Sequence, residues 1–324
     1  MIIFERRFKI MKKNFLAIMI SAAMVLSLAG CDSDPTPPPE SSVKSTNSST
    51  SSSAPKSSLP AEEPDNTSYS PESDFEVVNC TGGVSIRKYL GNAAEVVIPK
   101  KINGKSVVSI GRTAFYQCLT LKEVKIPNSV TKLASGAFQG CIQLQSISIP
   151  DSITEMEDNT FAGCKRLEKV EIGSGLTQIG YASFHNCEKL KSINIPDNVK
   201  AISAFAFYYC TGLEEVNIGS GVTEIGDNAF NHCNALKQVN IPGNVLKIGS
   251  GSFEFCESLE TVTIAEGLLS LNTSAFNYCP KLTSVNIPDS AIEFFIYLVG
   301  SPNVKFTYKG KTYNINELEK VING

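Results

Sequence analysis

The chain is poor in the groups on which most enzyme sites depend. It has only two histidines, His185 and His232, and neither belongs to a motif that would pair a base with a nucleophile. The signatures G-x-G-x-x-G and G-x-S-x-G are both absent. We therefore expect no enzyme, no catalytic residues, no metal site and no cofactor, and we expect both histidines to be ordinary residues of surface turns.

A basic surface is also missing. The full chain has 29 lysines and arginines against 32 acidic residues, and its first 30 residues carry five of these basic side chains and one of the acidic ones. Beyond residue 30, 24 basic and 31 acidic side chains remain, a net charge of −7. Because nucleic-acid binding normally needs a basic face, we expect no nucleic-acid partner.

The N-terminus has the pattern of an export signal. Basic residues precede an apolar run over residues 15–29, and small residues follow at its end. The sequence L-A-G-C at residues 28–31 resembles a bacterial lipobox, which implies cleavage before Cys31 and lipidation of its sulfur. We therefore predict a lipoprotein signal peptide over residues 1–30 and a lipid anchor at Cys31. An ordinary membrane helix is the alternative, and Met11 is an alternative start of the chain.

A segment of low complexity follows the predicted anchor. Between residues 32 and 72, 25 of 41 residues are Ser, Thr or Pro. Such a composition cannot offset the entropy lost on ordering, so we predict that residues 31–72 form a disordered tether. The protein is then expected to be exported, anchored to the bacterial cell membrane and displayed at the cell surface.

The rest of the chain is dominated by a repeat. The pattern A/S/T-F-x-x-C-x-x-L-x-x-V/I-x-I recurs every 23 residues, and a constant period of this length indicates a solenoid. One coil cannot bury enough apolar surface alone, so neighbouring coils must stack. The phenylalanines that carry the register are Phe115, Phe138, Phe161, Phe184, Phe207, Phe230, Phe253 and Phe276.

One repeat shows how each coil is built. Val124 and Ile126 alternate with charged residues, which predicts a short strand with its apolar side inward. Pro127 ends this strand, because proline has no N–H to continue the ladder. We predict an N-terminal cap and a repeat zero over residues 73–113, with a hairpin at residues 102–105. Eight repeats over residues 114–290 and a C-terminal cap ending in a hairpin over residues 291–324 complete the prediction.

The quoted motifs, I-P-x-x-V-x-x-I followed by A-F-x-x-C-x-x-L, resemble the BspA-like leucine-rich repeat family over about residues 75–306. The resemblance implies an α/β-type repeat solenoid: a leucine-rich repeat with 23-residue coils, short strands on one face, and caps at both ends. It also implies an exported or surface-attached protein, and some members of the family are adhesins. The family has no general catalytic residues that could be assigned to this chain. Thr160, Ser183 and Ser252 depart from the pattern, which has Ala before Phe, and the last coil lacks V-x-x-I after Ser290.

A cysteine stands three residues after each repeat phenylalanine, from Cys118 to Cys279. In a stacked ladder the Cβ vectors run parallel, which does not suit the dihedral of a disulfide. A line of cysteines also cannot converge on one metal ion. Buried thiols that act as small apolar groups are therefore the preferred interpretation, with oxidation of some of them left open.

Two surfaces are candidates for ligand binding. The second residue after each phenylalanine is aromatic in four late coils, at Tyr209, His232, Phe255 and Tyr278, and stacking of coils would align these rings in one row. Rings that merely shield the cysteine turn and stack on each other are the alternative. The other surface is the strand face, where Asn194, Asn217 and Asn240 fall at equivalent positions. A ladder that only keeps this face soluble is the alternative there.

The leading functional hypothesis is therefore a non-catalytic surface lipoprotein whose solenoid binds an extracellular protein or glycan, in adhesion or recognition. The alternative is a structural spacer or assembly element of the cell envelope that has no specific ligand.

Overall fold

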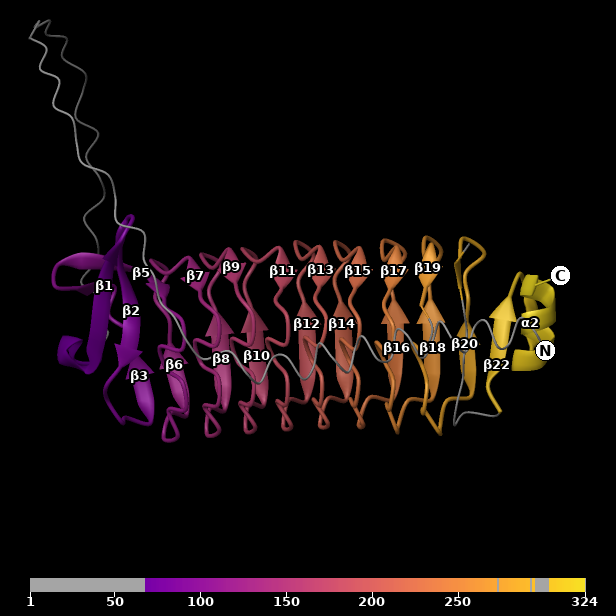
Figure 1. The fold of residues 1–324 in the computed structure, drawn as a ribbon, viewed down its shortest axis with the longest axis horizontal. Helices are drawn as coiled ribbons and strands as arrows, with labels where there is room; N and C mark the ends of the chain where they lie inside the picture. Colours follow the sequence, from indigo (N-terminus) through magenta and orange to yellow (C-terminus); the bar gives the residue numbers. More distant parts are fainter. Residues whose placement is uncertain (1–67, 273, 292, 295–302, 324) are drawn as a thin grey trace, which may run out of the picture. The chain divides into compact units, whose positions relative to one another are not determined.

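The computed structural model of the chain describes residues 68–272, 274–291, 293–294 and 303–323. The predicted signal peptide, Cys31 and the tether as far as residue 67 lie outside the described residues. The described part belongs to one compact unit, Pro64–Gly324. In this unit the coils follow one another in sequence order, as the rows of arrows in Figure 1 show.

The predicted strands form the main strand row. Their alternating apolar residues point inward; Val124 is 3% exposed, whereas Glu123 and Lys125 are exposed. Paired strands are parallel and offset by one coil, so that Val170 lies opposite Ile147. The strands are β3 (Glu95–Val97), β6 (Glu123–Lys125), β8 (Ser146–Ile149), β10 (Lys169–Ile172), β12 (Ser192–Ile195), β14 (Glu215–Ile218), β16 (Gln238–Ile241), β18 (Thr261–Ile264), β20 (Ser284–Asn286) and β22 (Lys305–Tyr308).

The hydrogen bonding of this row is interrupted in two places, although the β6–β8 pair persists with Pro150 directly after β8. The ladder breaks between β10 and β12 and again between β14 and β16. In both places a proline, Pro196 or Pro242, follows the second strand. At the same position Gly173 donates its N–H to the carbonyl of Ile149 in the preceding coil, at 2.8 Å, a bond that a proline cannot make.

Each coil also has a second, shorter strand, which the sequence analysis did not predict. Their inward side chains are apolar; Ile110 and Leu133, for example, are both fully buried. They form the other row of arrows in Figure 1. The strands are β5 (Lys105–Ile110), β7 (Lys132–Leu133), β9 (Glu155–Met156), β11 (Gln178–Ile179), β13 (Ala201–Ile202), β15 (Glu224–Ile225), β17 (Lys247–Ile248), β19 (Ser270–Leu271) and β21 (Glu293–Phe294).

The solenoid of 23-residue coils with a cap at each end is confirmed, but its coils are not of the α/β type. Among the described residues the helical segments are η1 (Glu72–Asp74) and α2 (Ile315–Asn323), one at each end. The segment between the two strands of a coil is made of tight turns instead. Neither helix of this part of the chain is long and apolar enough to cross a membrane.

The core is a column of phenylalanine rings. Phe207 stacks on Phe184 and Phe230 with ring centroids 5.2 and 5.1 Å apart, and its side chain is fully buried. The cysteines lie beside this column; Cys210 Sγ donates a hydrogen bond to the carbonyl of Phe184 at 3.2 Å. The prediction of buried thiols is confirmed from Cys141 to Cys279, whereas Cys118, in the first repeat, is only half-buried.

The N-terminal cap continues both the sheet and the ring column. β1 (Phe75–Cys80) and β2 (Gly83–Tyr89) form an antiparallel hairpin, and β2 pairs with β5. Tyr89 stacks on Phe115 with centroids 5.0 Å apart. The predicted hairpin is present as β4 (Lys101–Ile102) and β5, with Asn103 and Gly104 in the left-handed region. The N–H of Ser70 donates to Val97 O, so part of the segment assigned to the tether lies against this cap.

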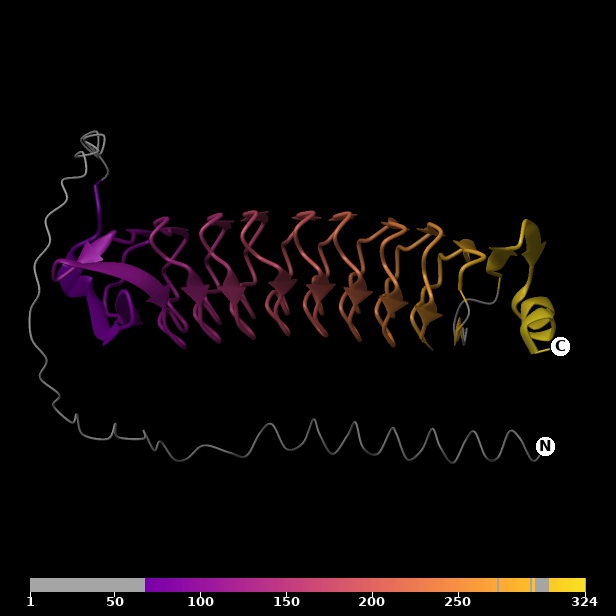
Figure 2. The same cartoon turned by 90° about the horizontal axis from the view of Figure 1, so that it is seen from above.

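The C-terminal cap contains the predicted hairpin, formed by β22 and β23 (Lys311–Tyr313), and in addition the helix α2 (Figure 2). Asn314 and Glu317 form a reciprocal capping box at the start of this helix, with hydrogen bonds of 2.8 and 3.0 Å. Leu318 is fully buried, which fixes the helix to the end of the solenoid. The backbone of Phe294 pairs with Leu271, so the coil that lacks V-x-x-I still adds a short strand.

Candidate ligand-binding surfaces

The candidate aromatic residues occupy a turn with an unusual backbone. At the second position after each repeat phenylalanine, φ lies between 52° and 74°, in the left-handed region. This conformation turns the N–H toward the next coil; that of His232, for example, donates to Glu254 O at 2.9 Å. Gly140 and Gly163 meet this requirement without strain, since glycine has no Cβ. In the late coils the same position carries large rings.

These rings form one stacked row, as the sequence analysis predicted. The ring centroids of Tyr209 and His232 are 4.1 Å apart, those of His232 and Phe255 are 4.5 Å apart, and those of Phe255 and Tyr278 are 4.6 Å apart. The planes of the last two pairs differ by only 3° and 2°. Tyr209 and Tyr278 are exposed, and the two rings between them are half-buried. We call these four residues the aromatic ridge.

Further rings, which the sequence analysis missed, continue the ridge toward the earlier coils. Tyr208 packs at 74° to Tyr209 with centroids 4.7 Å apart, and Phe205 packs at 75° to Tyr208. Tyr181 and His185 contact Phe205 and Tyr208, respectively. Tyr181 is 45% exposed, so this tilted cluster adds to the accessible aromatic surface. The Tyr-Tyr pair at residues 208–209 was the signal available in the sequence.

The two histidines are not ordinary surface residues, contrary to the expectation from sequence. His185 and His232 are both half-buried among aromatic rings. Burial lowers the pKa of both imidazoles, and Glu257 partly opposes this shift in the pKa of His232. His232 therefore contributes to the ridge mainly as a flat neutral ring.

A line of polar side chains runs beside the ridge. Asn231 Nδ2 donates to Glu254 Oε2 at 3.2 Å and to Asn228 Oδ1 at 2.9 Å. Asn231 and Asn277 are buried, and Glu254 is half-buried between their coils. Burial raises the pKa of Glu254, while its hydrogen bonds from Asn277 and Asn231 work in the opposite direction.

The three candidate asparagines of the strand face lie on neighbouring strands but only two of them border the same hollow. Asn194 on β12 and Asn217 on β14 are joined by a side-chain hydrogen bond of 2.8 Å. Asn217 and Asn240 line a shallow hollow of about 400 Å³, together with apolar side chains such as Ile218. The hollow suits a small polar group, but the amide of Asn217 already donates to Asn194 and to Glu215.

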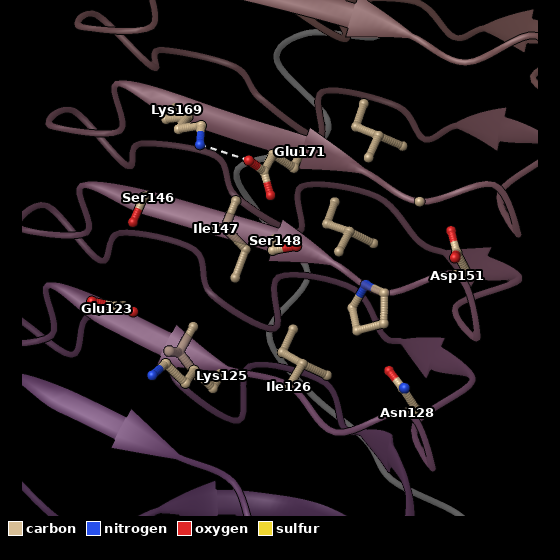
Figure 3. A pocket seen from close by; sticks show the side chains of 15 residues that line it. Glu123, Lys125, Ile126, Asn128, Ser146, Ile147, Ser148, Asp151, Lys169 and Glu171 are labelled. Atoms are coloured by element: carbon tan, nitrogen blue, oxygen red, sulfur yellow. Dashed lines mark ion pairs between the residues drawn. The ribbon is translucent and has the colours of Figure 1, made fainter.

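A second, larger hollow of about 550 Å³ lies over β6, β8 and β10 (Figure 3). Lys169 and Glu171 form an ion pair at its surface, with Nζ and Oε1 2.6 Å apart. Ser148 lies on the central strand, and Asn128 and Asp151 lie beyond the strand ends. Lys125, Ser148 and Glu171, which line this hollow, stand at the position of Asn194 in earlier coils, so the hollow lies on the predicted strand face.

The buried thiols of the cysteine ladder are held in hydrogen bonds. Each buried thiol from Cys141 to Cys279 donates a hydrogen bond to a carbonyl of the preceding coil. Burial raises the pKa of Cys164 and of Cys210 to about 12, so these thiols stay protonated. Within the described part of the chain, no group of three or more His, Cys, Asp or Glu side chains is placed to hold a metal ion.

The repeat itself is recognised by comparison with known families. The BspA type leucine rich repeat region matches residues 89–202 and 177–297. This chain belongs to the BspA-type leucine-rich repeat family. No curated protein sequence matches it.

Solved structures of bacterial leucine-rich repeat proteins are similar to this BspA-type chain. A leucine rich cell surface protein from Faecalibacterium prausnitzii A2-165 is 26% identical, with a TM-score of 0.59, over 75% of this chain and 76% of that one. A leucine-rich repeat protein from Bacteroides ovatus is 25% identical, with a TM-score of 0.42, over 72% and 77% of the two chains.

Proposed function

We propose that this BspA-type chain is a non-catalytic lipoprotein of the bacterial cell surface, whose solenoid recognises an extracellular protein or glycan in adhesion or a related contact. The observation that carries the proposal is the aromatic ridge. Four consecutive coils place a ring on a backbone position that favours glycine, and the end rings are exposed. Its ligand residues are Tyr209, His232, Phe255 and Tyr278.

The energetics of the ridge support a role other than stability. A non-glycine residue in the left-handed region costs about 1–2 kcal/mol. A stacked aromatic pair contributes about 0.5–1.5 kcal/mol beyond its area burial. The ridge has four such residues and three such pairs, so stacking at most offsets the backbone strain. The same backbone conformation occurs at Gln117 and Asn186 in earlier coils, so the rings, and not the strain, distinguish the late coils.

Export and anchoring rest on the N-terminal sequence and on the surface location named for the similar protein from Faecalibacterium. Replacing Cys31 with alanine, Cys31→Ala, should prevent lipidation and release the protein from membranes or leave it unprocessed. Fatty-acid labelling and cell fractionation measure this directly. Labelling of the variant equal to that of the wild type would remove the anchor from the proposal.

Ligand binding is tested by a variant that keeps the backbone and removes the rings. Asn186 already occupies the left-handed position in the preceding coil, with φ of 62°. The ridge variant therefore combines Tyr209→Asn, His232→Asn, Phe255→Asn and Tyr278→Asn. Its binding to immobilised matrix proteins and mucin should be lost, while its melting temperature stays close to that of the wild type.

The matched control changes the strand face instead. Asn217→Ser and Asn240→Ser together alter the hollow over β14 and β16 and should leave binding intact. Loss of binding in this control alone would transfer the site to the strand face. If the wild type binds none of the probes, the spacer hypothesis becomes the better account.

A further inference from the structure

The way in which the ridge rings stack restricts what they can recognise. Each interior ring has a neighbour on both faces, with centroids 4.1 to 4.6 Å apart. At the N-terminal end of the ridge, Tyr208 packs against Tyr209. The interior rings therefore present their edges to a partner, and their faces are occupied within the protein.

Ring edges and ring faces have opposite electrostatic character. The face of an aromatic ring carries partial negative charge and the edge carries partial positive charge. An exposed edge therefore favours the face of another aromatic ring or a carbonyl oxygen. Stacking of a sugar ring requires an open aromatic face, and His232 and Phe255 do not offer one.

Edge-to-face contacts of this kind already occur within the protein. Tyr208 meets Tyr209 at 74° and His232 at 82°, both edge-to-face arrangements. Phe205 and Tyr208 pack in the same manner, at 75°. A partner that continues this arrangement along the ridge must carry aromatic side chains on a backbone rich in carbonyl groups, as a polypeptide does.

The charge beside the ridge indicates which charged side chains a partner should carry. The turn segments of the four ridge coils, 208–212, 231–235, 254–258 and 277–281, contain two carboxylates, Glu254 and Glu257, both in the coil of Phe255, and one cation, Lys281, in the last coil. Glu257 is exposed and acts electrostatically on His232. Positively charged side chains that flank an aromatic residue would complement this surface.

We infer that the aromatic ridge binds a polypeptide segment in which aromatic side chains are flanked by lysine or arginine, and that it does not bind glycans. The inference rests on the proposed function and narrows it to one class of partner. Aromatic side chains of the segment place their ring faces on the ridge edges, and the flanking cations lie near Glu254 and Glu257.

The absence of tryptophan from the chain allows a direct test. The variant Phe255→Trp places a single tryptophan in the centre of the ridge, where its fluorescence reports occupancy. The probes are peptides selected by phage display against the full chain, and, separately, mucin glycans, chitin, cellulose and xylan. The ridge variant with asparagine at 209, 232, 255 and 278 is the negative control for both sets.

The selected peptides should be rich in aromatic and basic residues, should shift the emission of the Phe255→Trp protein, and should bind the ridge variant at least about tenfold more weakly. Glycan binding that shifts the same emission and is lost in the ridge variant would overturn this inference but leave the proposed function in place. If neither probe set distinguishes the ridge variant from the wild type, both the inference and the proposed site are wrong.

Discussion

Two columns of stacked rings run through this solenoid, and they differ in almost every physical respect. The inner column consists of the repeat phenylalanines, which are at most 3% exposed and stack at 4.8 to 5.6 Å. The outer column is the aromatic ridge, which stacks at 4.1 to 4.6 Å and has exposed ends. The inner column passes through every repeat, whereas the outer one is confined to the late coils.

The position that carries the ridge rings also differs between early and late coils. Gly163 and Phe255 stand at equivalent places with similar left-handed backbones, φ of 73° and 59°. A Cβ at Gly163 would lie 3.8 Å from the nearest atoms of Gly140, so an early coil has room for a side chain. Steric space at the Cβ therefore does not explain why rings appear only in the late coils.

The largest effect is expected in the inner column. Phe207→Ala removes a buried ring that contacts Phe184 and Phe230, and it should cost about 3–5 kcal/mol of unfolding free energy. Because each coil is stabilised by its neighbours, both adjacent interfaces should loosen. Denaturant unfolding measures the loss; less than about 1 kcal/mol would show that the inner column is not the core.

A smaller effect on stability is expected in the outer column, where the alanine variant of Phe255 should be less stable than the glycine variant. Phe255→Ala loses two ring contacts but keeps a Cβ in the left-handed region, whereas Phe255→Gly loses the same contacts and relieves the strain. The glycine variant should therefore be more stable than the alanine variant by about 1 kcal/mol. Denaturation midpoints of the two variants decide the matter. The reverse order would mean that the backbone here is not left-handed.

The smallest effect concerns pH. Because burial lowers the pKa of His232 below its ordinary value of 6.5, the folded protein binds fewer protons than the unfolded chain just below that pH. This part of the stability is present above pH 6.5 and is lost as the pH falls toward the lowered pKa.

His232→Phe keeps a ring in the stack and removes the titration. Its melting temperature should fall less on acidification than that of the wild type, and should differ little at pH 8. Glu254, whose pKa is raised, acts in the opposite sense in both proteins, so it cancels in the comparison. Identical acid sensitivity of the two proteins would contradict the burial of the imidazole.

The repeat period was sufficient to predict the coil, its core and the alignment of the ridge rings, because a fixed period places equivalent residues in adjacent coils. The second strand row was missed because strands such as Lys132–Leu133 have two residues, too few for an alternating pattern. Helix α2 was missed although the pair Asn314 and Glu317 has the spacing of a capping box.

The orientation of the ridge rings was not predicted from the sequence. Alignment of Tyr209 with His232 followed from the period, but whether faces or edges point outward depends on the left-handed backbone at each residue. Phe205 joins the tilted cluster because its own φ of 59° is also left-handed. A phenylalanine taken alone does not indicate that conformation, since bulky residues rarely adopt it, although Asn228 and Gly251 hold the equivalent place in the next two coils.

The central claim is that the inner column provides stability and the outer column provides binding. Phe253 and Phe255 test it within one coil, since the first is fully buried in the inner column and the second belongs to the ridge. The measurement is the unfolding free energy of Phe253→Ala and of Phe255→Ala, each beside the wild type. We expect a loss of about 3–5 kcal/mol for the first and no more than about 2 kcal/mol for the second. Equal losses would show that the ridge is a structural column like the inner one, and would contradict the account.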